Sequence, residues 1–111
     1  MRTVITDEVR RAMADLDVLV TPMSLTVAST FDGYDPDAMR RSPNFCAIWN
    51  VTGQPAASIC CGFSADGLPI GMQIVGKAFD EAMVLRVGDA YQRLTDWHQR
   101  TPAATREVQP A

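Results

Sequence analysis

The fold of this chain is decided by residues 50–76, NVTGQPAASICCGFSADGLPIGMQIVG. Two short apolar runs, residues 56–61 and 70–75, flank a segment rich in Gly, Asp and Pro, which predicts a strand, a tight loop and a second strand. We expect these two strands to pair with each other across residues 62–67. Both runs are continuously apolar rather than alternating, so we also expect other structure to cover both faces of the sheet.

The segments upstream predict a helix, a third strand and a long loop. Residues 3–15 carry an apolar stripe at helical spacing, with Asp7 and Glu8 near its start. Residues 18–20 follow as a short strand that ends at a Thr-Pro pair. Residues 23–42 are rich in Ser, Thr, Asp, Gly and Pro, which predicts a long loop of the kind that is often functional. Residues 43–49, PNFCAIW, predict a short helix with Pro43 at its first position and Gly53 near its end.

A second long helix is predicted over residues 79–100, with Asp80 as its cap. Its stripe predicts that the helix packs on the sheet. The tail, residues 103–111, has no apolar periodicity and is expected to fray. The expected core over the whole chain consists of Leu16, Ile59, Ile70, Met72, Ile74, Val84 and Val87.

Composition indicates one soluble globular domain of 111 residues, with 47% hydrophobic and 21% charged residues. A net charge of −3 without a basic cluster argues against a nucleic-acid partner. No apolar run approaches the ~20 residues of a membrane span, and no signal-peptide pattern opens the sequence. The three cysteines include the adjacent pair Cys60 and Cys61, which is a poor disulfide or metal site and is typical of reduced thiols in a cytoplasmic protein.

Two motifs could carry chemistry, and neither does so convincingly. Gly71 to Ala78 fits the start of a phosphate-binding loop, but its inner residues belong to an apolar strand and no hydroxyl follows Lys77. His98 is the only histidine, and near a helix end it would complement the helix dipole. We therefore expect no cofactor, no metal and no catalytic residue within this chain.

Residues 50–76, followed by AFDEAMVLRVGDAYQRLTDWHQRTP, closely resemble the C-terminal end of the amidase signature family. Upstream, LDVLVTPMSLT resembles that family's strand and Thr-Pro turn before its long loop, so that the likeness runs from about residue 16 to 102. One departure is Cys60-Cys61-Gly62, where many members have Pro-Cys-Gly. The resemblance implies an α/β fold, the C-terminal part of a mixed-sheet amidase-signature domain, with residues 1–102 as the domain segment.

The resemblance also implies what lies outside the chain. Family members hydrolyse amide bonds with a Ser–Ser–Lys triad, whose lysine lies far upstream and whose two serines lie in and after a Gly/Ser-rich stretch. This sequence contains no such stretch. By likeness, Asn44, Phe45 and Trp49 are expected to line the pocket for a small-molecule amide substrate; the alternative is that Phe45 and Trp49 are core packing. Pro43 stands where the tRNA amidotransferase A subunits carry an Asp that holds glutamine, which argues against that branch.

These observations leave two functions open. The first is the C-terminal portion of an amidase, inactive alone, whose partner is the missing N-terminal portion or a second copy. The second is a non-catalytic interaction module or split subunit that pairs through an open sheet edge. An isolated piece of a larger sheet exposes unpaired backbone groups and apolar faces, so either function predicts association.

Overall fold

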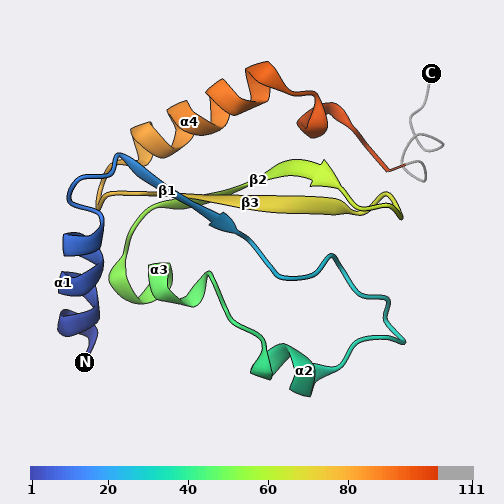
Figure 1. Cartoon of the computed structure of the whole chain (residues 1–111), viewed down its shortest axis with the longest axis horizontal. Helices are drawn as coiled ribbons and strands as arrows, with labels where there is room; N and C mark the ends of the chain where they lie inside the picture. Colours follow the sequence, from blue (N-terminus) through green and yellow to red (C-terminus); the bar gives the residue numbers. More distant parts are fainter. Residues whose placement is uncertain (103–111) are drawn as a thin grey trace.

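The computed structural model describes residues 1–102, and of Met39 it describes the backbone alone; the predicted fraying of residues 103–111 lies outside the described range. Figure 1 shows a small sheet between helices, with the chain's elements in the predicted order and two additions, a helix inside the long loop and a final 3₁₀ turn. The α/β class is confirmed. The elements are α1 (Arg2–Ala12), β1 (Val18–Pro22), α2 (Pro36–Arg41), α3 (Ala47–Thr52), β2 (Ala56–Phe63), β3 (Pro69–Gly76), α4 (Glu81–Leu94) and η1 (Trp97–Gln99).

The sheet has three strands in the order β1-β3-β2, and both pairings are antiparallel. The predicted hairpin of β2 and β3 is confirmed. Its turn is closed by Ser64, whose Oγ accepts a hydrogen bond from the Leu68 backbone N–H at 3.1 Å, and Gly67 adopts a φ of +77°. A residue with a Cβ would be strained at that angle, which explains the Asp-Gly pair here. β1 joins the other side of β3, so β3 is the central strand.

A β-bulge at Cys61 interrupts the pairing of β2 with β3. Cys60 pairs with Gly71 and Gly62 pairs with Ile70, which leaves Cys61 as the extra residue. The Cys61 carbonyl accepts a hydrogen bond from the Tyr91 hydroxyl of α4 at 3.3 Å. The bulge therefore provides the carbonyl that ties α4 to β2. All three cysteines are free thiols.

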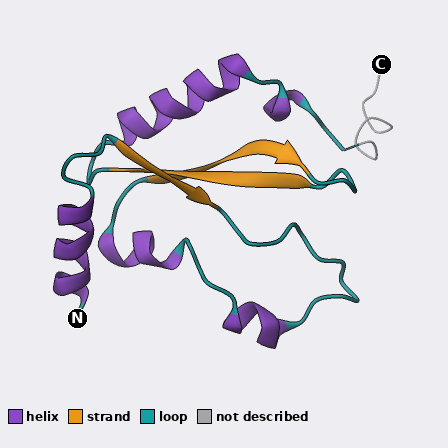
Figure 2. Cartoon of the chain, in the orientation of Figure 1, coloured by secondary structure: helices purple, strands orange, loops and turns teal. Residues whose placement is uncertain are grey.

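The helices form a layer on each face of the sheet. α4 covers one face, whereas α1 and α3 lie on the opposite side (Figure 2). Alternate residues of β3 serve the two layers, because successive strand side chains point to opposite faces. Ile74 lies under α4 near Gly88, while Val75 packs with Met13 and Trp49 in the other layer.

The predicted core is confirmed in its centre and wrong at its edges. Ile74 and Val84 are buried, and Ile59, Met72 and Val87 are half-buried. Leu16 and Ile70 are each 41% exposed, so both predictions are wrong. Leu16 lies in the turn after α1, where its N–H donates to the Met13 carbonyl, and Ile70 lies at the start of β3, away from the end that α4 covers.

Both long helices are shorter than predicted. α1 ends at Ala12 and has no acidic residue in its first turn, whereas Arg10 and Arg11 occupy its last turn. Extending the helix further would bring Asp15 to its C-terminal end, where a negative charge opposes the helix dipole. α4 ends at Leu94 because Thr95 is extended, with φ −138° and ψ 162°. His98 therefore lies in η1 rather than at the end of α4, so the dipole interpretation is wrong for it.

Capping residues account for the two short helices. The prediction of one continuous loop over residues 23–42 is wrong, because α2 lies inside it: the Asp35 side chain accepts from the Asp37 N–H and Pro36 takes the first helical position. α3 begins at Ala47, not at Pro43, because the Asn44 side chain takes up the first free N–H groups. Gly53 ends α3 as predicted, with a φ of +81°.

Gly76 allows α4 to lie directly on β3. A Cβ at Gly76 would lie 2.7 Å from Val84 Cγ2 and 3.1 Å from the Asp80 carbonyl oxygen. Gly76→Ala should therefore lower the free energy of unfolding by about 1–3 kcal/mol, measured by urea denaturation. Gly62→Ala is the matched control, because a Cβ there meets nothing within 4 Å. Equal stability of the two variants would contradict the close packing of α4.

Trp49 is a core residue whose buried ring nitrogen has no hydrogen-bond partner among residues 1–102. It is 8% exposed and packs with Met13 and Val75. Trp49→Ala should lower the free energy of unfolding by about 3–5 kcal/mol. Trp49→Phe should lower it by only about 1 kcal/mol, because no hydrogen bond is lost. Ile48→Ala, at the exposed neighbour, is the control in the same denaturation experiment.

Candidate functional site

The segment before α3 carries the residues that the sequence assigns to substrate binding. Asn44 is exposed, and its Oδ1 accepts hydrogen bonds from the N–H groups of Cys46 and Ala47, both at 2.9 Å. Phe45 is half-buried, and Trp49 belongs to the core described above. The structure thus places Asn44 and Phe45 next to each other ahead of α3, and Trp49 one turn further on with its ring packed inside.

Gln73 connects this segment to the centre of the sheet. Its side chain is 3% exposed, and its Nε2 donates to the Phe45 carbonyl at 3.1 Å and to Thr21 Oγ1 at 3.0 Å. Thr21 is the pairing partner of Gln73 on β1. One side chain therefore holds together the central strand, an edge strand and the segment that leads into α3.

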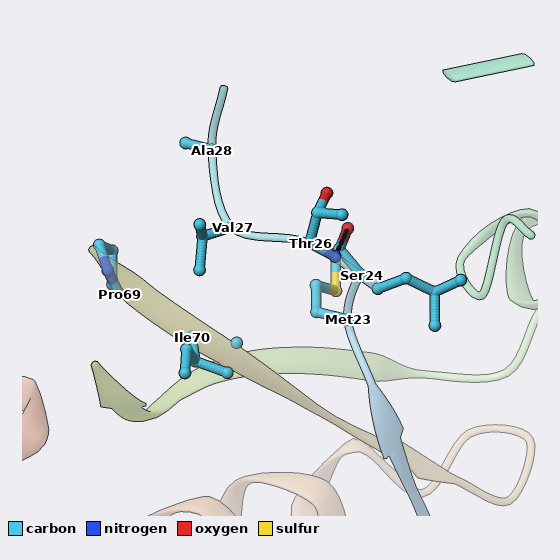
Figure 3. A pocket seen from close by; sticks show the side chains of 9 residues that line it. Met23, Ser24, Thr26, Val27, Ala28, Pro69 and Ile70 are labelled. Carbon is cyan, nitrogen blue, oxygen red and sulfur yellow. Dashed lines mark hydrogen bonds between the residues drawn. The ribbon is translucent and has the colours of Figure 1, made fainter. Parts of the chain in front are cut away.

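Two adjoining hollows lie where β1 passes into the long loop. The first, of about 300 Å³, lies between residues 23–28 and the start of β3. Figure 3 shows the loop residues Met23, Thr26 and Val27 around it, together with Pro69 and Ile70 of β3. The second, of about 320 Å³, lies over β1 and β3 and shares Ser24, Ile70 and Gly71 with the first.

These hollows are mostly apolar, and the three predicted pocket residues do not line them. Their hydroxyl groups come from Thr21, Ser24 and Thr26, and Ser24 Oγ accepts from the Thr26 N–H at 3.3 Å. An apolar floor with a few hydroxyls can hold a small organic group, but it supplies no strong acid or base.

The one lysine of the chain has a structural contact far from these hollows. Lys77 Nζ donates to the Ala14 carbonyl at 3.1 Å, just after α1. Lys77 follows the end of β3, whereas the hollows lie at its start, about 20 Å away along an extended strand. No Ser–Lys pair with the geometry of an activated nucleophile arises from Lys77 and Ser24.

The described residues offer no metal centre and no membrane span. Among residues 1–102, no group of three or more His, Cys, Asp or Glu side chains could hold a metal ion. Within the same range, no helix has both the length and the apolar character needed to cross a bilayer.

Sequence reasoning missed Gln73 because it treated β3 as a continuous apolar run. The signal was present as a single amide residue inside IGMQIV. A polar side chain in the middle of a buried strand must find hydrogen-bond partners, and this requirement points to a contact with another segment. The partner segments, which lie far away in sequence, could not be read from the pattern.

Comparison with curated proteins finds relatives that match nearly the whole of this chain. The A subunit of glutamyl-tRNA(Gln) amidotransferase from Chloroflexus aggregans is 47% identical over 108 residues, which cover 96% of this chain and 22% of that protein. The protein of the same name from Gloeobacter violaceus is 43% identical over 110 residues, or 97% of this chain and 22% of that protein. This chain thus spans about a fifth of the length of these relatives.

Solved structures show the same fold in two enzymes of different description. The A subunit of glutamyl-tRNA(Gln) amidotransferase from Thermotoga maritima matches with a TM-score of 0.70 and 32% identity, over 77% of this chain and 19% of that one. The structure of 6-aminohexanoate cyclic dimer hydrolase matches with a TM-score of 0.75 and 27% identity, over 92% of this chain and 24% of that one. The family described as Amidase matches residues 1–85, which is most of the chain, and the chain therefore belongs to the amidase family.

Proposed function

We propose that this chain is the C-terminal portion of an enzyme that cleaves carbon–nitrogen amide bonds, and that the Ser–Ser–Lys triad lies outside it. One observation carries the proposal: the chain belongs to the amidase family over residues 1–85, yet its single lysine is bound to the Ala14 carbonyl. This portion would then supply strands of the enzyme's sheet and a wall of its substrate pocket. In this proposal the chain alone is inactive.

The proposed contribution to the substrate pocket is the segment before α3. Asn44 and Phe45 stand at an ordered turn, since Asn44 caps two N–H groups and the Phe45 carbonyl is held by Gln73. Trp49 supports this segment from the core. A pocket wall benefits from such order, because rigid lining residues bind a substrate without losing conformational freedom.

A second candidate is the A subunit of a glutamyl-tRNA(Gln) amidotransferase. The relatives that are 43–47% identical to this chain carry that name, which favours this candidate. Pro43 argues in the other direction, because that branch is expected to carry an Asp at this position. The structural likeness does not separate the two candidates, since a cyclic dimer hydrolase matches with the higher TM-score. This segment is a framework common to both kinds of enzyme, so we place amide-bond cleavage first and the amidotransferase second.

An uncovered surface supports the proposal that the chain works with a partner. The chain exposes 8537 Å², whereas a compact monomer of 12.1 kDa exposes about 6000 Å². Its radius of gyration is 16.7 Å, against about 13 Å for a compact domain of this length. The start of β3 and the neighbouring β1 are poorly covered: Val20 is 49% exposed beside Ile70. We place the partner at the β1 edge, because a bulge interrupts β2 and η1 packs against it.

Self-association tests this surface directly. The isolated chain should show concentration-dependent association in sedimentation experiments, because β1 presents unpaired backbone groups beside an apolar hollow. Val20→Lys should weaken the association about tenfold, since it places a charge on that surface. Leu85→Lys, at an exposed apolar position on α4 that lines neither hollow, is the matched control. A monomer at all concentrations, with a cooperative thermal transition, would contradict the need for a partner.

Activity measurements test the proposed function itself. The purified chain should hydrolyse no aliphatic or aryl amide, because a pocket wall without the nucleophile and its base retains almost none of the rate enhancement. Co-expression with the Chloroflexus aggregans relative, shortened by its matched segment, should give amide hydrolysis that neither piece shows alone.

Lys77→Ala serves as the control in both assays. It should leave the activity of the co-expressed pair intact, because the Lys77 ammonium donates to the Ala14 carbonyl, away from both hollows. Turnover by the chain alone that survives repurification and disappears in Lys77→Ala would overturn the proposal.

A further inference from the structure

We infer that Gln73 is a positioning residue that joins the two ends of the long loop, at Thr21 and at Phe45, and thereby holds the proposed pocket wall in place. We call this junction the neck of the loop. The role of this segment as a pocket wall rests on the proposed function. The junction that Gln73 makes between the two ends of the loop is tested independently of that function. The chain leaves the sheet after β1, runs through the long loop of residues 23–42, which contains α2, and returns at residues 43–45 just before α3. Thr21 lies just before the point of departure, Phe45 lies at the return, and Gln73 bonds to both.

The chemistry of the position calls for an amide. A glutamine side chain offers two N–H donors on Nε2, and both find an acceptor here. The Phe45 carbonyl can only accept, which fixes the NH₂ group on that side. Glutamate would place a carboxylate oxygen against a carbonyl oxygen, and an apolar residue would remove the hydrogen bond that the half-buried Phe45 carbonyl accepts.

Further contacts show that the two ends of the loop meet at this point. The Met23 N–H donates to the Gly71 carbonyl at 3.1 Å, which continues the β1 pairing beyond Pro22. Cys46 Sγ lies 3.7 Å from Met23 Sδ and 3.9 Å from the Met23 carbonyl. A Cβ at Gly71 would lie 3.0 Å from Met23 Cβ, so a side chain at this position would require Met23 to move by a few tenths of an ångström.

This arrangement separates the neck from the body of the loop. Gln73 is 3% exposed at the sheet, whereas the loop body projects away from the sheet with α2 near its far end (Figure 1). Rearrangement of the body around a ligand would leave Asn44 and Phe45 in place as long as the neck is closed. Gln73 thus orders the wall without itself lining either hollow.

The thiol of Cys46 reports the state of the neck. In a background of Cys60→Ser and Cys61→Ser, whose hydroxyls can still donate to the carbonyls of Gly62 and Ile70, only Cys46 reacts with a thiol reagent. Gln73→Met keeps the length of the side chain and removes both hydrogen bonds. It should raise the labelling rate of Cys46 about tenfold or more, and Thr21→Val, which removes one acceptor, about fivefold.

A control and a second measurement separate closure of the neck from general stability. Gln92→Met, at a half-buried position on α4, should leave Cys46 labelling unchanged. Amide hydrogen exchange of Gln73→Met should rise at residues 45–47 and stay unchanged in α4. Unchanged labelling in Gln73→Met, or exchange that rises equally in α4, would overturn the inference.

The co-expressed pair supplies the functional readout. If Gln73 positions a pocket wall, Gln73→Met should raise KM about tenfold and change kcat less, because the loss falls on substrate binding. A fall in kcat with unchanged KM would overturn the positioning role. If the unsubstituted pair is inactive, the proposed function fails instead, and the labelling still decides whether Gln73 closes the neck.

Discussion

The pairing of β3 with a strand on each side is the constraint on which the rest of the structure depends. β3 forms antiparallel ladders with both β1 and β2, so its backbone groups are satisfied on both edges. That position buries Gln73, Ile74, Val75 and Gly76. A strand buried in this way presents one face to α4 and the other to α1 and α3, whereas η1 packs on β2 at the opposite end of the sheet, where Trp97 contacts Phe63.

Burial of one amide in that strand gives the molecule its specific connections. Apolar side chains can pack in many arrangements, whereas a buried donor must meet an acceptor at a defined distance. Gln73 meets two, on Thr21 and Phe45, and so links three segments. Trp49 contributes differently: its ring fills space beside Val75, and its Nε1 adds no such restriction.

The sequence contained enough to predict the hairpin, the α/β class and the family, because Gly, Asp and Pro mark the turn and apolar runs mark the strands. Local patterns also placed Ile74 and Val84 in the core correctly. They failed for Leu16 and Ile70, whose exposure depends on where the helices end rather than on their own apolar character. The capping roles of Asn44 and Asp35 could have been recognised from the sequence, because both residue types commonly accept hydrogen bonds from backbone N–H groups near a helix start. The pairing of β1 with β3 and the contacts of Gln73 could not, because no local pattern specifies a partner far away in the chain.

That distance has a consequence for how the chain is made. The β2–β3 hairpin is local and can form as soon as its residues are available, but Thr21 and Gln73 are 52 residues apart in sequence. A contact between distant residues stabilises the chain only after the entropy cost of closing a long loop has been met, and this requirement slows folding. During synthesis on the ribosome, β1 emerges early and has to wait, unpaired, until β3 has left the exit tunnel. The nascent chain is therefore most exposed to misassembly during that interval, when chaperone binding would matter most.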